Sequence, residues 1–480
     1  MTESTPPKKI AVIGGGISGL AAAHRLIELA PDTNLTLFEA SDRLGGAIRT
    51  THRDGFLLDR GPDNFITQLP WGTSLCKRLG IDGELLSTDP ARRKAFVVRK
   101  GRLLEIPEGF VLMAPSRVWP VISTRILTLR GKLRMAGEYF LKPKKDGGDE
   151  SFASFVSRRL GREVFDRLVQ PLISSIYTAD ATKLSIDATM PQFVKMEREH
   201  GGLIRGARKM AAARKAAAKG ASGARYSMFT TPEGGMVRFV EAISERLPDG
   251  AVRLGADVAS VQASQSGEGW DVVLADGSRE TFDGVIIATP GHKTQSIIAD
   301  VDTDVAEELA GVPYATSAVV SLGYRRDQIG HPLDGFGYVV PLIEGRKTLA
   351  GSFSSVKYTG RAPDGCELLR VFVGGAVQGE VAKLPDDELK KLIHEELCEL
   401  LHVTGEPLLA EITRWPSAMP QYQVGHVERV ARIEGRMTSL PGLELAGNAY
   451  HGVGVPQCIH TGEQAAERML GEGGAKGQRD

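Results

Sequence analysis

Short apolar runs alternate with helix-like patterns near the start of the chain. The apolar segment 8–13 predicts a buried strand, and the Ala- and Leu-rich segment 20–30 predicts a helix that Pro31 ends. Segments 35–38 and 56–58 predict two further strands. Because this alternation is typical of a parallel sheet covered by helices, we expect an α/β domain at the N-terminus.

The rest of the chain predicts a mixture of helices and strands. Helical patterns extend over 70–90, 110–142, 151–177, 236–247, 386–401 and 459–470, and the basic segment 201–225 is either an exposed helix or a mobile loop. Strand patterns extend over 252–261, 270–274, 279–288 and 442–446, and segment 94–106 predicts a hairpin turning at Lys100–Gly101. At 480 residues the chain is too long for one compact domain, so we expect two or three.

A glycine-rich turn follows the first predicted strand. Gly14 permits a tight turn, Gly16 lets the backbone approach a diphosphate, and Gly19 lets the helix pack closely on the strand. The N–H groups that begin this helix then point at the phosphates. Glu39 lies 20 residues after Gly19, where a carboxylate can accept hydrogen bonds from ribose hydroxyls. This spacing predicts a dinucleotide site, and the acid disfavours a 2′-phosphate.

The segment after Glu39 indicates FAD rather than NAD. It contains Arg43 and the pair Gly45–Gly46, and it looks like the FAD extension of amine oxidases and their relatives. Glycines there let backbone N–H groups reach the diphosphate, and an arginine can neutralise it. A glycine pair alone would be a surface turn. No second glycine fingerprint follows a later strand, so we expect electrons to leave to dioxygen or another acceptor, without a separate NAD(P)H domain.

Charge is unevenly distributed, although the formal net charge is zero. Residues 91–225 contain 28 Lys and Arg against 12 Asp and Glu, and the remainder contains 31 against 47. A basic segment of this kind can meet anionic lipid, a polycarboxylate substrate or nucleic acid, or it can be a solvated surface. Nucleic acid is the weakest of these, because aromatic residues are not interleaved with the basic ones in 201–225. The apolar and basic residues of 110–142 fit either a membrane-surface helix or a core helix with a solvated basic face.

Cysteine spacing and hydropathy indicate the cellular compartment of the chain. Its four cysteines form no C-x-x-C pair, which argues against a zinc site, a redox dithiol or a disulfide framework, and fits a reducing cytosol. No apolar stretch approaches the ~20 residues that span a bilayer. The N-terminal segment lacks the apolar core of a signal peptide, so we expect the chain to stay inside the cell.

Several segments resemble the oxygen-dependent protoporphyrinogen oxidases, a family that includes the bacterial coproporphyrinogen III oxidases. The resemblance extends over residues 8–470. It is carried by the two glycine segments above and by the segments 61–64, 170–177, 229–236, 335–341 and 447–458. The cysteine context that binds flavin covalently in monoamine oxidases is absent, so the resemblance implies one non-covalent FAD per chain.

The resemblance also implies which residues bind the cofactor and the substrate. FAD contacts are expected from the glycine turn, from the strand ends, from the turn beside the flavin ring and from the start of the closing helix: Gly14, Gly15, Gly16, Ile17, Ser18, Gly19, Glu39, Ala40, Arg43, Gly46, Gly61, Pro62, Asp63, Asn64, Val258, Trp415, Val453, Gly454 and Val455. For Trp415 a buried core tryptophan is the alternative. The substrate pocket is expected at Phe336 and Val339, with a basic group for the propionates at Arg93 or Lys94.

The implied reaction is the six-electron oxidation of a porphyrinogen to the porphyrin in haem biosynthesis, by an oxidoreductase acting on CH–CH groups. Hydride leaves a bridging carbon for flavin N5 and a pyrrole N–H proton is lost, in three such steps. Dioxygen reoxidises the flavin and gives hydrogen peroxide. Asp63 is the ionisable group expected nearest the flavin, and it is a candidate catalytic residue. Peripheral contact with the inner face of the cell membrane, and a homodimer, are further implications.

The expected architecture is a discontinuous Rossmann-like FAD-binding domain (1–90, 226–313 and 426–475), a mixed α+β substrate domain (314–425) and a basic helical lobe (91–225). The sequence does not decide whether protoporphyrinogen or coproporphyrinogen is the substrate. Two rival functions stay open as well. One is another enzyme of the superfamily, such as a carotenoid desaturase or an amine oxidase. The other is a flavin-binding or porphyrin-carrying protein without turnover.

Overall fold

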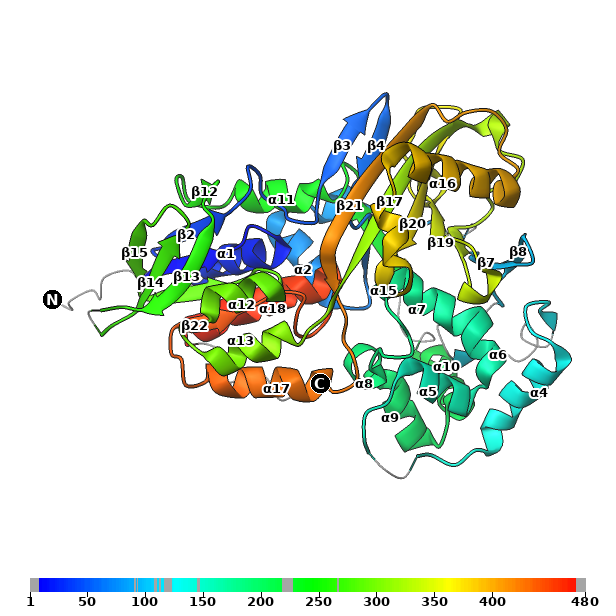
Figure 1. The fold of residues 1–480 in the computed structure, drawn as a ribbon, viewed down its shortest axis with the longest axis horizontal. Coiled ribbons are helices and arrows are strands. Elements are labelled where there is room, and N and C mark those ends of the chain that lie inside the picture. The colour runs from blue at the N-terminus through cyan, green and yellow to red at the C-terminus, as the bar shows by residue number, and fades with distance from the viewer. Residues whose placement is uncertain are drawn as a thin grey trace.

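The computed structural model describes residues 8–89, 92, 94–107, 110–111, 114–115, 123–144, 147–217, 228–265 and 267–471. Figure 1 shows three parts: a layered sheet domain that contains both ends of the described chain, a second sheet domain beside it, and a cluster of helices below the second sheet. This arrangement confirms the predicted α/β class with a separate mixed domain and a helical lobe.

The first part is built on a parallel sheet. Its strand order is β12-β2-β1-β16-β22, and every neighbouring pair is parallel. The strands are β1 (Lys9–Ile13), β2 (Asn34–Glu39), β12 (Val252–Leu254), β16 (Gly284–Ile287) and β22 (Leu443–Leu445). Two segments far along the chain, β16 and β22, therefore return to the sheet that the first 39 residues begin.

Alternate residues of β1 pack on opposite faces of this sheet. Ile10 and Val12 join one core, whereas Ala11 and Ile13 join another. Because strand side chains alternate between faces, a strand that is apolar at every position must be covered on both. One face carries α1 (Ile17–Leu29), α2 (Pro70–Leu79), α11 (Val237–Ser244) and α18 (Val455–Met469). The other carries β13 (Val258–Ala263), β14 (Trp270–Leu274), β15 (Arg279–Phe282), α12 (Gly291–Ile298), α13 (Thr303–Ala310) and α17 (His426–Met437).

The second part is a seven-stranded sheet with the order β21-β17-β20-β19-β18-β7-β8. Its strands are β7 (Phe96–Arg99), β8 (Arg102–Glu105), β17 (Tyr314–Arg325), β18 (Gly337–Val339), β19 (Thr348–Phe353), β20 (Cys366–Gly374) and β21 (Leu409–Pro420). The hairpin β7–β8 has the predicted turn, but it pairs with β18. It therefore belongs to the second sheet, although we expected all of 91–225 in the helical lobe.

This second sheet is also covered on both faces. One face packs against α16 (Asp386–Leu401), and the other packs against the helical lobe. Tyr338 and Val340 face α16, whereas Val339 between them faces the lobe. The alternation of strand side chains therefore directs Val339 toward the junction of the two parts.

The helical lobe lies between residues 129 and 217. Its helices are α4 (Leu129–Ala136), α5 (Phe152–Arg159), α6 (Arg162–Val164), α7 (Gln170–Tyr177), α8 (Ile186–Thr189), α9 (Pro191–His200) and α10 (Leu203–Ala217), with a 3₁₀ turn at Gly137–Phe140 and a π turn at Phe165–Val169. No helix in the described part of the chain is long and apolar enough to span a membrane.

Several predicted elements differ from the structure. The predicted helix 70–90 ends at Leu79 and is followed by β6 (Leu85–Ser87), and the predicted strand 279–288 divides at Asp283 into β15 and β16, which belong to different sheets. Within the helical pattern over 110–142, Ser123 is helical, and α4 begins at Leu129, where the Thr128 hydroxyl accepts the Gly131 N–H at 3.2 Å. Before it, β9 (Phe110–Val111) pairs with β10 (Ala114–Pro115), and 116–122 lie outside the described residues. The predicted strand 252–261 breaks at Gly255, whose φ is +66°. Its two halves, β12 and β13, enter different sheets.

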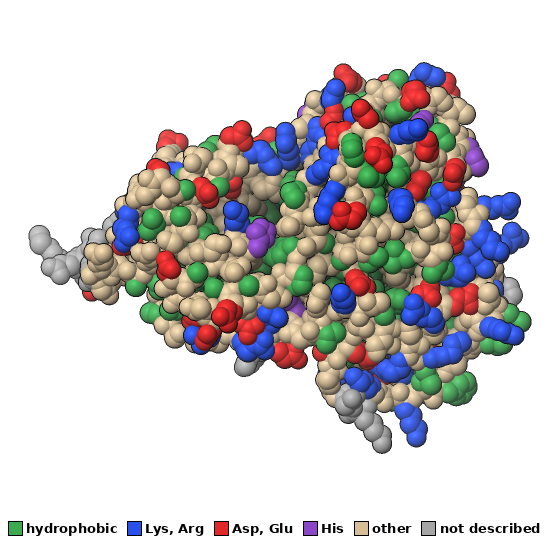
Figure 2. Space-filling view, in the orientation of Figure 1, with side chains coloured by type: hydrophobic (Ala, Val, Ile, Leu, Met, Phe, Trp, Pro, Cys, Tyr) green, Lys and Arg blue, Asp and Glu red, His purple; other side chains and the backbone are tan. Residues whose placement is uncertain are grey.

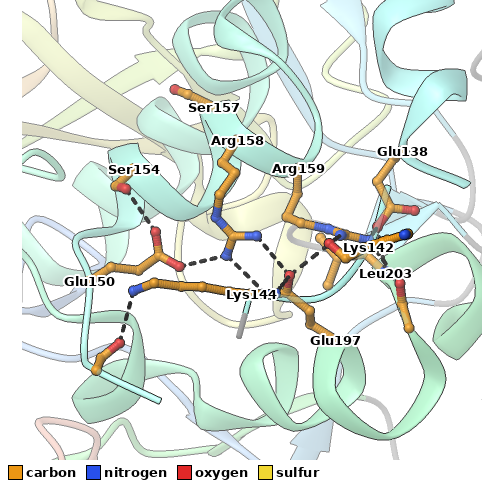
Figure 3. Close-up of polar contacts among 12 residues, drawn as sticks. Glu138, Lys142, Lys144, Glu150, Ser154, Ser157, Arg158, Arg159, Glu197 and Leu203 are labelled. Carbon is orange, nitrogen blue, oxygen red and sulfur yellow. Dashed lines mark hydrogen bonds and ion pairs between the residues drawn. The ribbon is translucent and has the colours of Figure 1, made fainter. Parts of the chain in front are cut away.

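A buried ion-pair network holds the lobe together (Figure 3). Arg159 and Glu138 form an ion pair in which both side chains are fully buried. Glu138 also accepts the backbone N–H groups of Leu203 (2.7 Å) and Ile204 (3.1 Å), which begin α10. The network thus supplies a counter-charge and acceptors for N–H groups that a helix start leaves unpaired.

Candidate functional site

The glycine turn has the geometry that the sequence predicts. Gly14 has a φ of +108°, and Gly16 precedes α1 with no side chain capping that helix. A Cβ added at Gly19 would lie 1.9 Å from the carbonyl oxygen of Gly14, so only glycine allows α1 to pack this closely. A Cβ added at Gly16 would meet no atom within 4 Å. The turn therefore leaves open space directly in front of the free N–H groups of α1.

The second glycine segment lies against this turn. The Gly45 N–H donates to the Gly15 carbonyl oxygen at 2.8 Å, and a Cβ added at Gly46 would lie 3.1 Å from the Cα of Gly16. Arg43 does not extend into the open space. Its guanidinium donates to the carbonyl oxygens of Leu44, Gly46 and Ile48. In this structure Arg43 therefore holds the glycine pair in place.

Glu39 ends β2 beside the same turn. Its carboxylate accepts the Gly15 N–H at 2.7 Å and both the N–H and the hydroxyl of Ser41. A carboxylate has about four acceptor positions, which leaves capacity for a ribose hydroxyl. The backbone of 255–256 donates to the carbonyl oxygens of Ser41 and Glu39, and the buried Val258 follows it. Glu39, Val258 and the exposed Ala40, three of the predicted FAD contacts, are thus brought together.

The closing helix α18 runs parallel to α1, so the two helices start at the same end. A Cβ added at Gly462 would lie 2.1 Å from the Ser18 carbonyl oxygen, and Arg25 pairs with Glu467 further along both helices. Gly454 precedes α18 and no side chain caps this helix either. Two helix N-termini with free N–H groups therefore point toward one region, where they stabilise negative charge.

The turn 61–64 lies between these helix starts and the second sheet. A Cβ added at Gly61 would lie 2.0 Å from the Ala47 carbonyl oxygen and 3.5 Å from the Trp415 ring. The Trp415 indole N–H donates to the Arg60 carbonyl oxygen at 3.1 Å. Trp415 is half-buried, so it lies at the edge of the site rather than in a closed core. Pro62 and Asn64 are half-buried as well, and the Asn64 amide donates to Asp63 at 2.9 Å.

Asp63 is surrounded by cations, which the sequence did not predict. Arg370 approaches its carboxylate at 2.9 Å and Lys357 at 3.3 Å. Burial alone would raise the pKa of Asp63, but Lys357 and Arg370 hold it well below its ordinary value. A permanently ionised, ion-paired carboxylate is a poor proton acceptor near neutral pH. The structure therefore argues against Asp63 as a catalytic base and indicates that it fixes Arg370 next to the turn, where Arg370 also donates to the Gly61 carbonyl oxygen at 2.5 Å.

Asp63→Asn is expected to leave the shape of the pH–rate profile unchanged between about pH 5 and 9, because the wild-type carboxylate is ionised throughout that range. The variant should instead lose stability, by about 1–3 kcal/mol, since the buried Arg370 loses its counter-charge. Because the folded-state pKa is depressed, this contribution is present above the unfolded pKa near 4 and is lost as the pH falls through the lower folded value. Parallel pH–rate profiles and thermal melts of both proteins check this. Loss of the acidic limb of the profile in Asp63→Asn would restore Asp63 as a base.

The predicted substrate residues are only partly brought together. Val339 is buried in the core that joins the second sheet to the lobe, and Val453 from the predicted flavin segment packs against the same core. Phe336 is half-buried, and its N–H donates to the Lys94 carbonyl oxygen at 2.7 Å. The Lys94 side chain is exposed and pairs with Asp334 (3.2 Å) and Glu105 (3.5 Å), so its charge is already neutralised. Arg93 lies outside the described residues.

Sequence reasoning also missed a cavity. It has a volume of about 240 Å³ and lies between the helical lobe and the second sheet domain, lined by residues that include Asp180, Lys183, Tyr314 and Gln421. None of the predicted site residues lines it. Arg370, by contrast, could have been noticed. An arginine inside an apolar strand pattern such as 366–374 indicates a buried partner.

The described residues fit FAD. The open space at Gly16, the two uncapped helix starts and the carboxylate of Glu39 match the needs of a diphosphate and a ribose. Among the described residues, no group of three or more His, Cys, Asp and Glu side chains could hold a metal ion.

Comparison with known proteins gives a consistent picture over almost the whole chain. Residues 17–470 match the family model of the flavin containing amine oxidoreductases. The chain is 32% identical to coproporphyrinogen III oxidase of Bacillus subtilis (strain 168), with 96% of this chain and 98% of that protein covered. It is 31% identical to chloroplastic protoporphyrinogen oxidase 1 of Arabidopsis thaliana, with 95% and 86% covered.

Solved structures also show this similarity over almost the whole chain. A crystal structure from Exiguobacterium sp. 255-15, provisionally named a protoporphyrinogen oxidase, superposes with a TM-score of 0.86 at 28% identity and covers 98% of this chain and 100% of that one. Reduced UDP-galactopyranose mutase shares the fold at 16% identity, with a TM-score of 0.72 and with 97% of this chain and 96% of that one covered. The chain therefore belongs to the flavin containing amine oxidoreductases, and its cofactor is FAD.

Proposed function

We propose that this chain oxidises a porphyrinogen to the porphyrin in haem biosynthesis, with dioxygen as the electron acceptor and hydrogen peroxide as the second product. Similarity to the Bacillus subtilis coproporphyrinogen III oxidase along the full length of both proteins carries the proposal. Coproporphyrinogen III is the favoured substrate, because bacterial relatives of that name are covered from end to end at 30–32% identity. Protoporphyrinogen IX is the alternative.

When bound, FAD supplies the two-electron oxidation and passes the electrons to dioxygen. The chain's own residues bind the cofactor and the substrate, orient them relative to each other, and exclude water from the site. Val339 and Val453 supply apolar contact at the junction where the macrocycle is proposed to lie, with the half-buried Phe336 at its edge. The uncapped start of α18 favours negative charge at the reduced cofactor. Aromatisation of the macrocycle supplies much of the driving force, so no strong general base is proposed.

The experiment is a direct absorbance assay. Freshly reduced coproporphyrinogen III and protoporphyrinogen IX are each mixed with the FAD-loaded chain in air, and growth of the porphyrin Soret band is followed. We expect turnover of both substrates with a higher kcat/KM for coproporphyrinogen III, because its four propionates meet more of the basic surface. If the chain oxidised neither compound, the proposed function would be wrong, and a desaturase, an amine oxidase or a carrier would be the alternatives. A higher kcat/KM for protoporphyrinogen IX would reverse the substrate preference.

Contact with an anionic membrane surface is the second part of the proposal. Large apolar side chains stand in solvent on α4 and the turn after it, with Leu129 73%, Leu133 65% and Phe140 81% exposed. Arg130 is exposed among them. Figure 2 shows apolar and basic side chains gathered together at the lower right, over this part of the lobe. Exposed aliphatic and aromatic groups beside cations are what a peripheral contact with anionic lipid requires. We propose a cytoplasmic enzyme that associates with the inner face of the membrane, as a monomer or a homodimer.

Leu133→Asp combined with Phe140→Asp is expected to lower binding to anionic lipid vesicles at least about tenfold, since two apolar anchors are lost. Ile343→Asp is the matched control, because this exposed isoleucine lies in the substrate domain. Vesicle flotation measures the effect. Binding of the wild type should weaken as salt is raised, because the cations are exposed. Equal binding to neutral and anionic vesicles, or none, would refute the contact.

A further inference from the structure

One buried hydroxyl joins both ends of the short loop that leads into α18. Tyr422 is 1% exposed, and its hydroxyl donates to the Asn448 carbonyl oxygen at 2.5 Å. The same hydroxyl accepts the Gly452 N–H at 2.9 Å. Gly452 has a φ of +137°, a conformation that other residues rarely adopt. The Tyr422 hydroxyl therefore spans residues 448–452, which we call the flavin-side loop because Val453 and Gly454 follow it directly.

A histidine holds the middle of the same loop. The His426 ring stacks on Tyr422 with the ring centres 4.0 Å apart and the planes 13° from parallel. Its Nε2 lies 3.0 Å from the Tyr450 carbonyl oxygen, so Nε2 carries the hydrogen and donates. Burial lowers the pKa of His426 to about 4, which keeps the ring neutral near pH 7. Tyr422 and His426 thus hold Asn448, Tyr450 and Gly452, every second residue of the loop.

The backbone of Tyr422 connects this loop to the helical lobe. The Ser185 N–H donates to the Tyr422 carbonyl oxygen at 2.8 Å, and the Val424 N–H donates to the Lys183 carbonyl oxygen at 3.0 Å. The Tyr422 side chain packs in the same core as Val339. One residue therefore contacts the lobe, the junction of the proposed substrate site and the loop before α18. A tyrosine that only stabilised the core of one domain would not need to contact all three of these parts.

We infer that Tyr422 and His426 are positioning residues that set where the flavin-side loop and the start of α18 stand relative to FAD and the substrate. Neither residue exchanges a proton in the reaction. The hydroxyl hydrogen of Tyr422 is already donated to Asn448, and burial raises its pKa well above 10. The substrate part of the inference rests on the proposed function, whereas the FAD part depends only on the cofactor.

Tyr422→Phe tests this, because it keeps the ring stacked on His426 and removes only the hydroxyl. We expect the visible bands of the bound flavin to shift, the Kd for FAD to rise several-fold, and kcat to fall about tenfold or more, while KM changes less than about twofold. The matched control is Tyr324→Phe. Tyr324 is another fully buried tyrosine that bonds a histidine, His394 at 2.9 Å, but it lies between β17 and α16. It should lose stability and leave the flavin bands unchanged.

Substitutions of His426 keep the inference testable if Tyr422→Phe does not fold. His426→Gln keeps a donor for the Tyr450 carbonyl oxygen and His426→Leu does not, so the flavin bands should shift more in the leucine variant. Wild-type flavin bands and Kd for FAD in both Tyr422→Phe and His426→Leu would overturn the inference, as would equal shifts in Tyr324→Phe. If the wild type oxidised no porphyrinogen but Tyr422→Phe still moved the flavin bands, the proposed function would fail and the FAD part of the inference would stand.

Discussion

Gly16→Val is expected to abolish tight FAD binding without unfolding the chain. A Cβ added at Gly16 meets no protein atom within 4 Å, and the residue has extended backbone angles that valine accepts. The side chain would instead fill the space in front of α1, where the diphosphate is predicted to lie. We expect the Kd for FAD to rise at least about 100-fold, which corresponds to about 2.7 kcal/mol. Titration of the apoprotein with FAD measures this.

Two other glycines separate steric exclusion of FAD from damage to the fold. Gly83→Val is the matched control, since a Cβ at Gly83 also meets nothing within 4 Å but lies away from the glycine turn. It should leave FAD affinity unchanged. Gly19→Ala should lose both FAD and stability, because its Cβ would lie 1.9 Å from the Gly14 carbonyl oxygen. If Gly16→Val bound FAD like the wild type, the diphosphate would not lie at this turn.

Arg159→Met should be the most destabilising substitution in the lobe. It removes the cationic partner of Glu138, a carboxylate with no solvent exposure. Glu138 then keeps only the hydrogen bonds from two backbone N–H groups. Breaking a buried pair in this way costs about 3–5 kcal/mol. Glu138→Gln should cost less, because Arg159 keeps Glu197 at 3.4 Å and the carbonyl oxygens of Lys142 and Gly201. Chemical denaturation of the single and double variants gives the coupling energy.

An exposed ion pair supplies the comparison for Arg159. Arg162 pairs with Asp166 one helical turn away and is 70% exposed, so Arg162→Met should change the free energy of unfolding by less than about 0.5 kcal/mol. Equal losses in Arg159→Met and Arg162→Met would mean that the buried network contributes no more than a surface pair. Protease cleavage within α10 should rise in Arg159→Met, since Glu138 holds the start of that helix.

The parts of the site that follow from local chemistry were predictable from the sequence. The glycine turn, Glu39 and the pair Gly45–Gly46 depend on backbone geometry within 40 residues, and the structure brings them together. The partners of Asp63 were not predictable. Lys357 lies 294 residues further along the chain, and its approach depends on how the second sheet packs against the turn 61–64.

Hydrogen bonds and ion pairs that a sequence pattern does not specify explain the other differences. Lys94 looked like a free cation, but Asp334, in the loop before β18, and Glu105, at the end of β8, form ion pairs with it. Arg43 was expected on a phosphate, yet three nearby carbonyl oxygens take its hydrogen bonds. The role of Tyr422 depends on carbonyl groups from a distant loop. Composition and periodicity contain no information on such pairs, because the path of the folded backbone decides which groups meet.

Anaerobic mixing of the FAD-loaded chain with excess coproporphyrinogen III tests the central claim most directly. Without dioxygen, substrate oxidation must leave its electrons on the flavin, so the visible band of the oxidised cofactor should bleach in a single phase. Admission of air should then restore the band, with hydrogen peroxide and porphyrin formed together. A flavin band that stays unchanged by either porphyrinogen, in a chain that binds FAD, would contradict the proposed function.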